Sequence, residues 1–184
     1  MADAERVRFR SATAGDAEPI ARLHADSWRR HYRGAYSDGF LDGDVVQDRL
    51  AVWSARLGHA PTPACTFVVE AAHGLVGFAH TVLDEDPRWG ALLDNLHVCH
   101  SHARRRIGTR LLRLTAAAVA ERRPGSALHL WVLEQNLAAQ AFYRARGGSC
   151  VERGIVQPPG GDAGRLNGAP VKLRFTWPDP AQLR

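Results

Sequence analysis

Residues 96–112, "LHVCHSHARRRIGTRLL", hold the densest group of chemically capable side chains in the chain. Four potential metal ligands lie in the first half of this segment: His97, Cys99, His100 and His102. Zinc sites bring such ligands together as closely spaced pairs that converge on one point. No second pair of matching spacing follows, because His129 and Cys150 each stand alone. The segment therefore does not predict a metal site.

A block of arginines follows these histidines, and it suggests two kinds of anionic partner. Arg104, Arg105 and Arg106 are consecutive, and Arg110 and Arg113 lie shortly after them. Such a cationic surface attracts phosphate. The patch is short and lacks the interleaved aromatic residues that stack on bases, so an arginine-rich nucleic-acid binder is the weaker interpretation. A strand, a loop and a helix N-terminus in succession would instead form a cradle for about one pyrophosphate, because N–H groups, the helix dipole and arginines converge there.

A second segment, "LHLWVLEQNLAAQAFYRARGG" at 128–148, carries further polar groups at regular spacing. An apolar strand leads into Asn136, and Tyr143 follows two helical turns later on nearly the same face. Asn136 is suited to cap the helix or to hold an amide of a ligand. Phe142 and Tyr143 could border a cleft or pack in the core, and the sequence leaves both open.

The composition limits the classes of protein that the chain can belong to. Its 184 residues suffice for one domain with a substantial core, and no apolar run approaches the ~20 residues of a membrane helix. The N-terminal stretch lacks the apolar centre of a signal peptide, and three scattered cysteines do not form a disulfide framework. We therefore expect a soluble, cytoplasmic protein without membrane contact. The net charge of +5 comes almost wholly from arginine, since Lys172 is the only lysine, and it favours an anionic partner.

Hydrophobic periodicity predicts an order of elements that positions these two segments. Strands are expected within 7–12, 66–83 (two strands around a turn at His73 and Gly74), 91–98, 127–133, 150–157 and 170–177. Helices are expected at 16–32, 45–57, 107–122 and 136–148. This order predicts an α+β protein, a mixed three-layer α/β/α arrangement. We expect one domain over 1–184 with its core at about 7–177.

The two segments together resemble the motifs of the GNAT superfamily of acetyl-CoA-dependent N-acetyltransferases. The second motif, N-x-x-A-x-x-F-Y-x-x-x-G, is matched in full: Asn136, Ala139, Phe142, Tyr143 and Gly147. The first, V-x-P followed by [Q/R]-x-x-G-x-[G/A] and L-L, aligns with Val98, His100, Ala103, Arg106, Gly108, Leu111 and Leu112. His100, Ala103 and Arg106 depart from it. The resemblance covers about Val7 to Trp177, and it implies a mostly antiparallel sheet of about seven strands with about four helices.

This resemblance implies a donor site for acetyl-CoA. Backbone groups of Leu96, His97 and Val98 would align the pantetheine and polarise the thioester carbonyl. The pyrophosphate would be held by the loop and helix start: Arg104, Arg105, Arg106, Ile107, Gly108, Thr109 and Arg110. The later helix would contribute Asn136, Ala139, Phe142 and Tyr143, and Tyr143 matches the general acid that protonates the departing thiolate.

The general base is not fixed by the sequence. Asp94 lies four residues before Val98, which places it on the same face of a regular strand. His97 has a more suitable pKa, but strand alternation sends it to the opposite face unless a bulge intervenes. Glu70 and Asp84 are further candidates. A further possibility is that a chain of water molecules alone removes the proton from the acceptor amine.

The acceptor pocket is expected between the first two helices and the 158–169 loop. Its predicted walls are aromatic or cationic: Trp28, Tyr32, Arg33, Tyr36 and Trp53. Aromatic walls favour an apolar or planar acceptor, although Trp28 and Trp53 could equally be core residues. The resemblance implies acetyl transfer to a primary amine of a small molecule or peptide, without a metal, in a chain that could form a homodimer. The altered pyrophosphate loop keeps a second hypothesis open, a CoA-binding sensor or interaction module without transfer activity.

Overall fold

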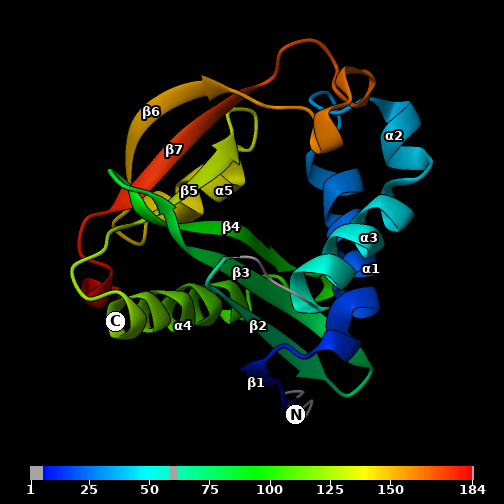
Figure 1. Cartoon of the computed structure of the whole chain (residues 1–184). Coiled ribbons are helices and arrows are strands. Elements are labelled where there is room, and N and C mark those ends of the chain that lie inside the picture. Colours follow the sequence, from blue (N-terminus) through cyan, green and yellow to red (C-terminus); the bar gives the residue numbers. More distant parts are fainter. Residues whose placement is uncertain (1–5, 59–61, 184) are drawn as a thin grey trace.

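The computed structural model describes residues 6–58 and 62–183, and the described residues form one seven-stranded sheet (Figure 1). Its strand order is β1-β2-β3-β4-β5-β7-β6, in which β4 and β5 are parallel and the other neighbours are antiparallel. The strands are β1 (Arg8–Ser11), β2 (Ala64–Ala71), β3 (Gly74–Asp86), β4 (Gly90–Val98), β5 (Leu128–Leu133), β6 (Ser149–Ile155) and β7 (Val171–Trp177). The predicted α+β class and the predicted order of strands along the chain are confirmed. Residues 1–5, 59–61 and 184 of the expected domain lie outside the described residues.

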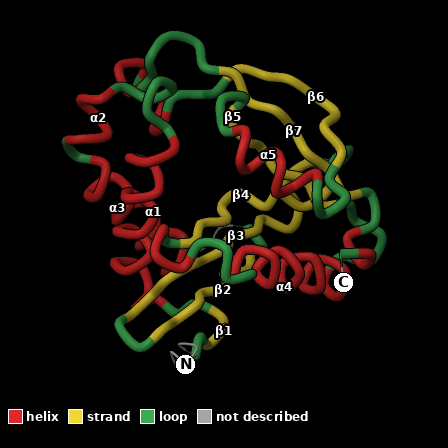
Figure 2. The backbone as a smooth tube through the Cα atoms, turned by 180° about the vertical axis from the view of Figure 1, so that it is seen from behind, coloured by secondary structure: helices red, strands yellow, loops and turns green. Residues whose placement is uncertain are grey.

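Helices cover both faces of the sheet, as Figures 1 and 2 show from opposite sides. The α-helices are α1 (Ala17–His31), α2 (Asp38–Asp42), α3 (Val45–Gly58), α4 (Ile107–Arg122) and α5 (Leu137–Arg144). Short 3-10 turns occur at η1 (Ala14–Asp16), η2 (His100–His102), η3 (Pro159–Gly161), η4 (Ala163–Arg165) and η5 (Pro180–Gln182). The four predicted helices are present. The sequence did not predict α2, because five residues are too few to show a helical period.

Alternation along the central strands divides the core between the two faces. Val68 and Phe78 pack with α1 and α3, whereas their neighbours Val69 and Ala79 pack with α4 and α5. Both strands are therefore apolar on both sides, as expected of strands in the middle of a sheet. We refer to these faces as the α1 face and the α4 face.

A β-bulge interrupts β4 and changes which side chains share a face. His80 pairs with Asn95 and Thr81 pairs with Leu93, so Asp94 is an extra residue in the ladder. Leu93 and Leu96 consequently both lie on the α4 face, although they are three residues apart. Asn95, the partner of buried His80, lies on the α1 face.

The parallel pair of β4 and β5 is short. Among the described residues, the two strands are paired at Ala91–Leu128 and Leu92–His129, and no pairing is recorded beyond Leu92. The backbone of β4 from the bulge to Val98 therefore has no β5 partner on that side. The sheet opens between two adjacent strands where the two sequence motifs meet.

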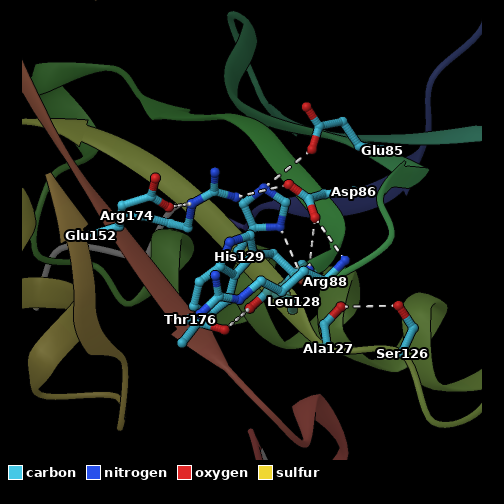
Figure 3. A network of polar contacts seen from close by, with 11 residues as sticks. Glu85, Asp86, Arg88, Ser126, Ala127, Leu128, His129, Glu152, Arg174 and Thr176 are labelled. Atoms are coloured by element: carbon cyan, nitrogen blue, oxygen red, sulfur yellow. Dashed lines mark hydrogen bonds and ion pairs between the residues drawn. The ribbon is translucent and has the colours of Figure 1, made fainter. Parts of the chain in front are cut away.

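Beyond this opening, the α1 face of β5 and β7 carries a polar network (Figure 3). The Arg174 guanidinium contacts Glu152 at 2.7 Å and Asp86 at 3.4 Å, and it lies 4.4 Å from the centre of the Trp131 ring. His129 Nδ1 lies 3.1 Å from the Trp89 carbonyl oxygen, and burial lowers the pKa of this imidazole. The network connects the end of β3 to β5, β6 and β7.

Candidate active site

A cavity of about 470 Å³ lies where β4 and β5 diverge. It is lined from the α1 face by Ser27, His31, Tyr32, Asp94, His97, Trp131 and Leu133. Its other walls, near the α4 face, include Leu96, Val98, His102, Ala103, Arg104, Arg106, Ile107, Gly108, Thr109, Asn136, Ala139, Phe142, Tyr143 and Arg146. Because these residues belong to opposite faces, the cavity connects the two sides of the sheet through the opening.

The loop between β4 and α4 has an unusual backbone. Arg104 and Arg106 adopt left-handed conformations with φ of +62° and +61°, and Arg106 is the residue directly before α4. Left-handed backbone favours glycine, which the family motif has at the position of Arg106. The arginine thus keeps the backbone shape of the motif. The first N–H groups of α4, at Ile107, Gly108 and Thr109, have no acceptors within the helix and border the cavity.

Not every predicted phosphate contact reaches the cavity. Arg104 and Arg106 line it, whereas Arg105 and Arg110 are not among its lining residues. The Arg110 guanidinium lies 4.2 Å from the centre of the Phe9 ring of the strand β1 region. Arg110 lies one helical turn further along α4 than Arg106, and its guanidinium contacts the edge strand β1 instead of the loop.

The two motif segments pack directly against each other at the start of α4. A Cβ atom on Gly108 would lie 3.4 Å from Phe142 and 3.7 Å from Leu96, which is ordinary van der Waals contact with both. Arg146 donates from Nε and Nη2 to Thr109 Oγ1 at 2.9 and 2.7 Å, and its guanidinium lies 3.7 Å from the Phe142 ring centre. Sequence reasoning missed Arg146, although its spacing of four residues from Phe142 on a helix was a usable signal.

Asn136 caps α5 and also borders the cavity. Its Oδ1 accepts from the backbone N–H of Ala139 at 3.1 Å, so its amide nitrogen is the group that can still donate to a ligand. Both roles proposed for Asn136 are therefore compatible with one conformation. Ala139 and Phe142 line the cavity on the same helix.

Tyr143 lies at the apolar side of the cavity. It is 8% exposed, and its ring contacts Phe142, Phe175 and Trp177. Burial raises the pKa of the Tyr143 phenol, with a smaller contribution from Tyr32. The hydroxyl therefore stays protonated at neutral pH and is suited to donate a proton or a hydrogen bond.

The bulge at Asp94 reverses the expectation for the base candidates. A regular strand would place Asp94 with Val98, but Asp94 forms an ion pair with Arg56 of α3 at 2.7 Å, whereas Val98 packs in the α4-face core. His97 lies on the α1 face with Asp94, against Phe78 and His24. The bulge shifts the alternation by one residue, so His97 shares a face with Asp94, which is the exception that the sequence left open, and the expectation that Asp94 shares a face with Val98 was wrong.

His97 is held as a neutral imidazole. Its Nδ1 lies 2.7 Å from Ser27 Oγ of α1. Burial lowers the pKa of His97 to about 4, nearby His31 lowers it further, and Asp94 opposes the change. At neutral pH the ring can accept a proton but does not carry a charge into the cavity.

The other two base candidates lie elsewhere. Glu70 of β2 pairs with Arg10 at 2.5 Å, and Asp84 of β3 pairs with Arg123 at 2.6 Å. The structure does not bring either carboxylate to the lining of the cavity. Their arginine partners lower the pKa of both carboxyl groups, which makes them weaker bases.

The predicted acceptor residues form a layered wall. Tyr32 lines the cavity, and Trp28 stacks behind it with ring centres 5.3 Å apart. Tyr36 is buried in the next layer and contacts both rings. Burial raises the pKa of Tyr32 to about 12, with Asp94 contributing in the same direction.

Arg33 and Trp53, like Trp28 and Tyr36, do not line the cavity. Arg33 forms ion pairs with Asp38 (2.7 Å) and Asp42 on the outer side of α2. Trp53 is fully buried, and its Nε1 donates to His24 Nδ1 at 3.0 Å. Both residues support the wall from behind instead of lining the cavity.

The 158–169 loop is fixed to the connection between α1 and α2. Backbone bonds join Ser37 N to Arg165 O (3.0 Å) and Asn167 N to Ala35 O (2.9 Å). The Arg165 guanidinium also pairs with Asp48 of α3, and Asp48 forms a second ion pair with buried Arg49. The loop therefore packs on the outer layer of the aromatic wall, and none of its residues lines the cavity, where the sequence had suggested a wall of the acceptor pocket.

No metal centre or membrane-spanning element accompanies this cavity in residues 6–58 and 62–183. Within these ranges, no group of three or more His, Cys, Asp and Glu side chains is arranged to hold a metal ion. Over the same residues, no helix combines the length and apolar character needed to cross a bilayer.

An anion-attracting helix start on one face, connected through a split sheet to an aromatic chamber on the other, is suited to group transfer between two substrates. Residues 22–147 match the sequence model of the acetyltransferase (GNAT) family. Because this match spans more than half of the 184 residues, the chain belongs to the acetyltransferase (GNAT) family. Comparison with curated proteins gives no match.

Solved structures of similar fold agree with this membership. The PaiA N-acetyltransferase of Thermoplasma acidophilum, in complex with coenzyme A, has a TM-score of 0.67 at 18% identity, covering 94% of this chain and 99% of that one. Arabidopsis thaliana NAA60 has a TM-score of 0.61 at 16% identity, both with acetyl-CoA (94% and 98% covered) and with a bisubstrate analogue (94% and 97% covered). At these identities the likeness shows the fold alone.

Proposed function

We propose that this protein transfers the acetyl group of acetyl-CoA to a primary amine. The observation that carries the proposal is the cavity through the opening between β4 and β5, with an anion cradle on one side and an aromatic chamber on the other. A donor and an acceptor can enter such a cavity from opposite faces and meet in the middle. Family membership, and relatives of the same fold in complex with coenzyme A or acetyl-CoA, support the choice of donor.

The residues present suit the donor's chemistry. Its pyrophosphate needs N–H donors and cations, which the start of α4, Arg104 and Arg106 would supply. Its pantetheine arm needs hydrogen-bond partners along an extended path, and the β4 backbone between Asp94 and Val98 would supply them because β5 does not. When bound, the donor supplies an activated thioester.

The acceptor amine must lose a proton before it can attack the thioester. Asp94 and His97 share the α1 face and line the cavity, so either group can take that proton, directly or through water. Asp94 would also attract the ammonium form of the acceptor. His97, held by Ser27, is neutral at neutral pH and would accept the proton only in passing, because burial disfavours the imidazolium and the proton would move on to water.

The thiolate that leaves the reacting carbon also requires a proton. It leaves on the side of that carbon opposite the amine. Tyr143 would donate this proton, since burial keeps the phenol protonated at neutral pH. The apolar surroundings of Tyr143 would also exclude water, which limits hydrolysis of the thioester.

Thermal unfolding with three parallel ligands tests the proposal against its alternatives. We expect acetyl-CoA to raise the melting temperature, while zinc chloride and duplex DNA leave it unchanged. Stabilisation by DNA in place of acetyl-CoA would favour the nucleic-acid binder, and no shift with millimolar acetyl-CoA would overturn the proposal.

A second experiment separates an enzyme from a sensor that binds CoA without transfer. Release of free thiol is measured over a panel of alkyl, aryl and peptide amines, first with the natural chain and then with Tyr143→Phe. We expect release that depends on the amine and a lower kcat in the variant. Binding without thiol release on any amine would favour the sensor, and unchanged kcat in Tyr143→Phe would remove the proposed role of Tyr143.

A further inference from the structure

The only lysine of the chain lies next to the cavity. Lys172 is on β7, where it pairs with Leu133 of β5, and its Nζ lies 4.3 Å from the centre of the Trp131 ring. Trp131 and Leu133 both line the cavity. Lys172 therefore lies directly beside two residues that line the chamber in which an acceptor amine would bind.

Lys172 also lies on the correct face of the sheet. Leu128 and Leu130 pack in the α4-face core, so the alternate residues of β5, Trp131 and Leu133, face the α1 side. Lys172 shares that face because it is the direct partner of Leu133 across the ladder. Asp94 and His97, the two candidate bases, border the same chamber from β4.

The surroundings of Lys172 favour a nucleophilic amine. The side chain is half-buried, and burial lowers the pKa of its ammonium group. The neighbouring Arg174 guanidinium lowers this pKa further, while Glu85, Glu152 and Asp94 act in the opposite direction. A larger fraction of Lys172 is therefore neutral at a given pH than for a lysine in water.

Packing alone does not account for a lysine at this position. Arg174 already covers the Trp131 ring, at 4.4 Å from its centre, and arginine is the better partner for an aromatic face. Among the lysine and arginine side chains of the sequence, all but Lys172 are arginine, and a guanidinium cannot act as an amine nucleophile. The single primary amine among the side chains is thus the one beside the cavity.

We propose that Lys172 is a site of self-acetylation, in which the chain's own active site acetylates Nζ. This inference rests on the proposed function, because it needs acetyl-CoA in the cavity. Neutral Nζ attacks the thioester carbonyl, the C–N bond forms and the C–S bond breaks. The amine proton passes to a base or water, and the thiolate takes a proton and leaves as coenzyme A. The flexible stem of lysine lets Nζ leave the Trp131 ring for this step.

The product changes the chamber chemically. An acetamide carries no positive charge, so the cation–π contact with Trp131 is lost and the acidic groups around it lose a partner. Acetylation of Lys172 would therefore make the chamber more attractive to a cationic acceptor.

Intact mass measurement followed by peptide mapping tests the proposal on the full chain. After incubation with acetyl-CoA, we expect one added acetyl group, located on Lys172 and absent from Lys172→Arg. The rate per molecule should not depend on protein concentration, because the reaction is intramolecular. Excess desulfo-CoA, which lacks the sulfur, should block it, and Tyr143→Phe should slow it at least several-fold.

Chemical acetylation is distinguished by a donor that does not require the cavity. Acetyl phosphate should label Lys172 far more slowly, and desulfo-CoA should not affect that reaction. Equal labelling of Lys172 by both donors, or equal labelling in Tyr143→Phe, would overturn self-acetylation. Acetyl groups on cysteine are identified by their removal with hydroxylamine, and those on the N-terminal amine by mapping.

Failure of this inference is separate from failure of the proposed function. Thiol release with external amines while Lys172 stays unmodified would overturn self-acetylation and leave the transferase intact. Absence of thiol release and of modification together would overturn both.

Discussion

Arg106 combines a backbone conformation that suits glycine with a side chain that suits phosphate. Its φ of +61° lies in the left-handed region, and this conformation costs a non-glycine residue about 1–2 kcal/mol. The same is true of Arg104, at +62°. This cost is tolerated where the surrounding loop enforces the shape, and such positions are concentrated at functional sites.

We expect Arg106→Gly to stabilise the free protein and weaken donor binding. Removal of the left-handed strain should raise the free energy of unfolding by about 1 kcal/mol, measured by urea denaturation. Loss of the guanidinium should weaken acetyl-CoA binding several-fold, measured by calorimetry. Arg105→Gly is the matched control, because its φ is not positive and the added flexibility should destabilise it. Unchanged or lower stability of Arg106→Gly would contradict the strain argument.

At the scale of elements, the start of α5 serves the helix and the cavity with one side chain. Asn136→Ala should lower the free energy of unfolding by about 1 kcal/mol, because the Ala139 N–H loses its acceptor. Asn136→Asp keeps that cap but removes the amide donor and adds a negative charge. We expect near-natural stability and weakened acetyl-CoA binding in Asn136→Asp, so thermal unfolding and calorimetry separate the two roles. Natural affinity in Asn136→Asp would show that Asn136 acts through the helix alone.

The layer between β4 and α1 should make stability sensitive to acid. The pKa of His97 is about 4 in the folded chain, below the ordinary value of about 6.5 that applies on unfolding. The unfolded state therefore binds more protons between these values, and stability falls as the pH drops from about 6.5 to 4. From this pair of values, His97 accounts for a loss of about 2 kcal/mol at pH 5.

Urea denaturation of His97→Gln at pH 7 and pH 5 checks this contribution. The variant should lose less stability between the two pH values than the natural chain does. His73→Gln, in the exposed turn between β2 and β3, should keep the natural difference. An unchanged difference in His97→Gln would show that other groups cause the acid sensitivity.

Elements with regular periodicity could be predicted from the sequence, and interruptions of that periodicity could not. The bounds of α4 follow from its apolar stripe and from Pro124 beyond its end, and they match the prediction. The bulge at Asp94 adds one residue without any local signal, because no glycine or proline marks it. The expectation that Asp94 shares a face with Val98 was wrong for that reason.

For the site as well, the direction of a side chain could be predicted where the element is regular and could not be predicted elsewhere. Asn136 and Tyr143 were predicted to border one cleft, and both line the cavity, because the helical period is regular between them. Arg33 was expected at the acceptor pocket, but α2 supplies Asp38 and Asp42 as partners on the outside. A five-residue helix that periodicity does not reveal thus decided where Arg33 lies.

For the whole molecule, the positive net charge should make donor binding depend on salt. With a net charge of +5 and three arginines at the cavity (Arg104, Arg106 and Arg146), a polyanionic donor is attracted over several ångströms. The screening length falls from ~10 Å at 0.1 M salt to ~3 Å at 1 M. We expect the Kd for acetyl-CoA to rise with salt, and the double variant Arg104→Gln, Arg106→Gln to flatten this dependence.

A charge-matched control separates local contacts from net charge. The double variant Arg22→Gln, Arg30→Gln removes two cations from the exposed face of α1, where Arg22 pairs with Glu18 and Arg30 with Asp26. It should leave both the Kd and its salt dependence nearly unchanged. An effect as large as that of the cavity variants would assign the salt dependence to the overall charge.

The short pairing between β4 and β5 has a mechanical consequence. The strands β1–β4 and the strands β5, β7 and β6 are joined by the two residue pairs at Ala91 and Leu92 and by the core beneath α4. The sheet thus consists of two halves with little pairing between them. A ligand with amide groups along the open edge of β4 would bridge the two halves. Cys99 N donates to Val76 O of β3, and by alternation the His97 amide also faces β3, whereas the amides of Leu96 and Val98 face the opening. The backbone amides of Leu96 and Val98 should therefore exchange with deuterium quickly in the free chain and slowly in the loaded one. Binding of the ligand in the cavity would then make the whole sheet more rigid.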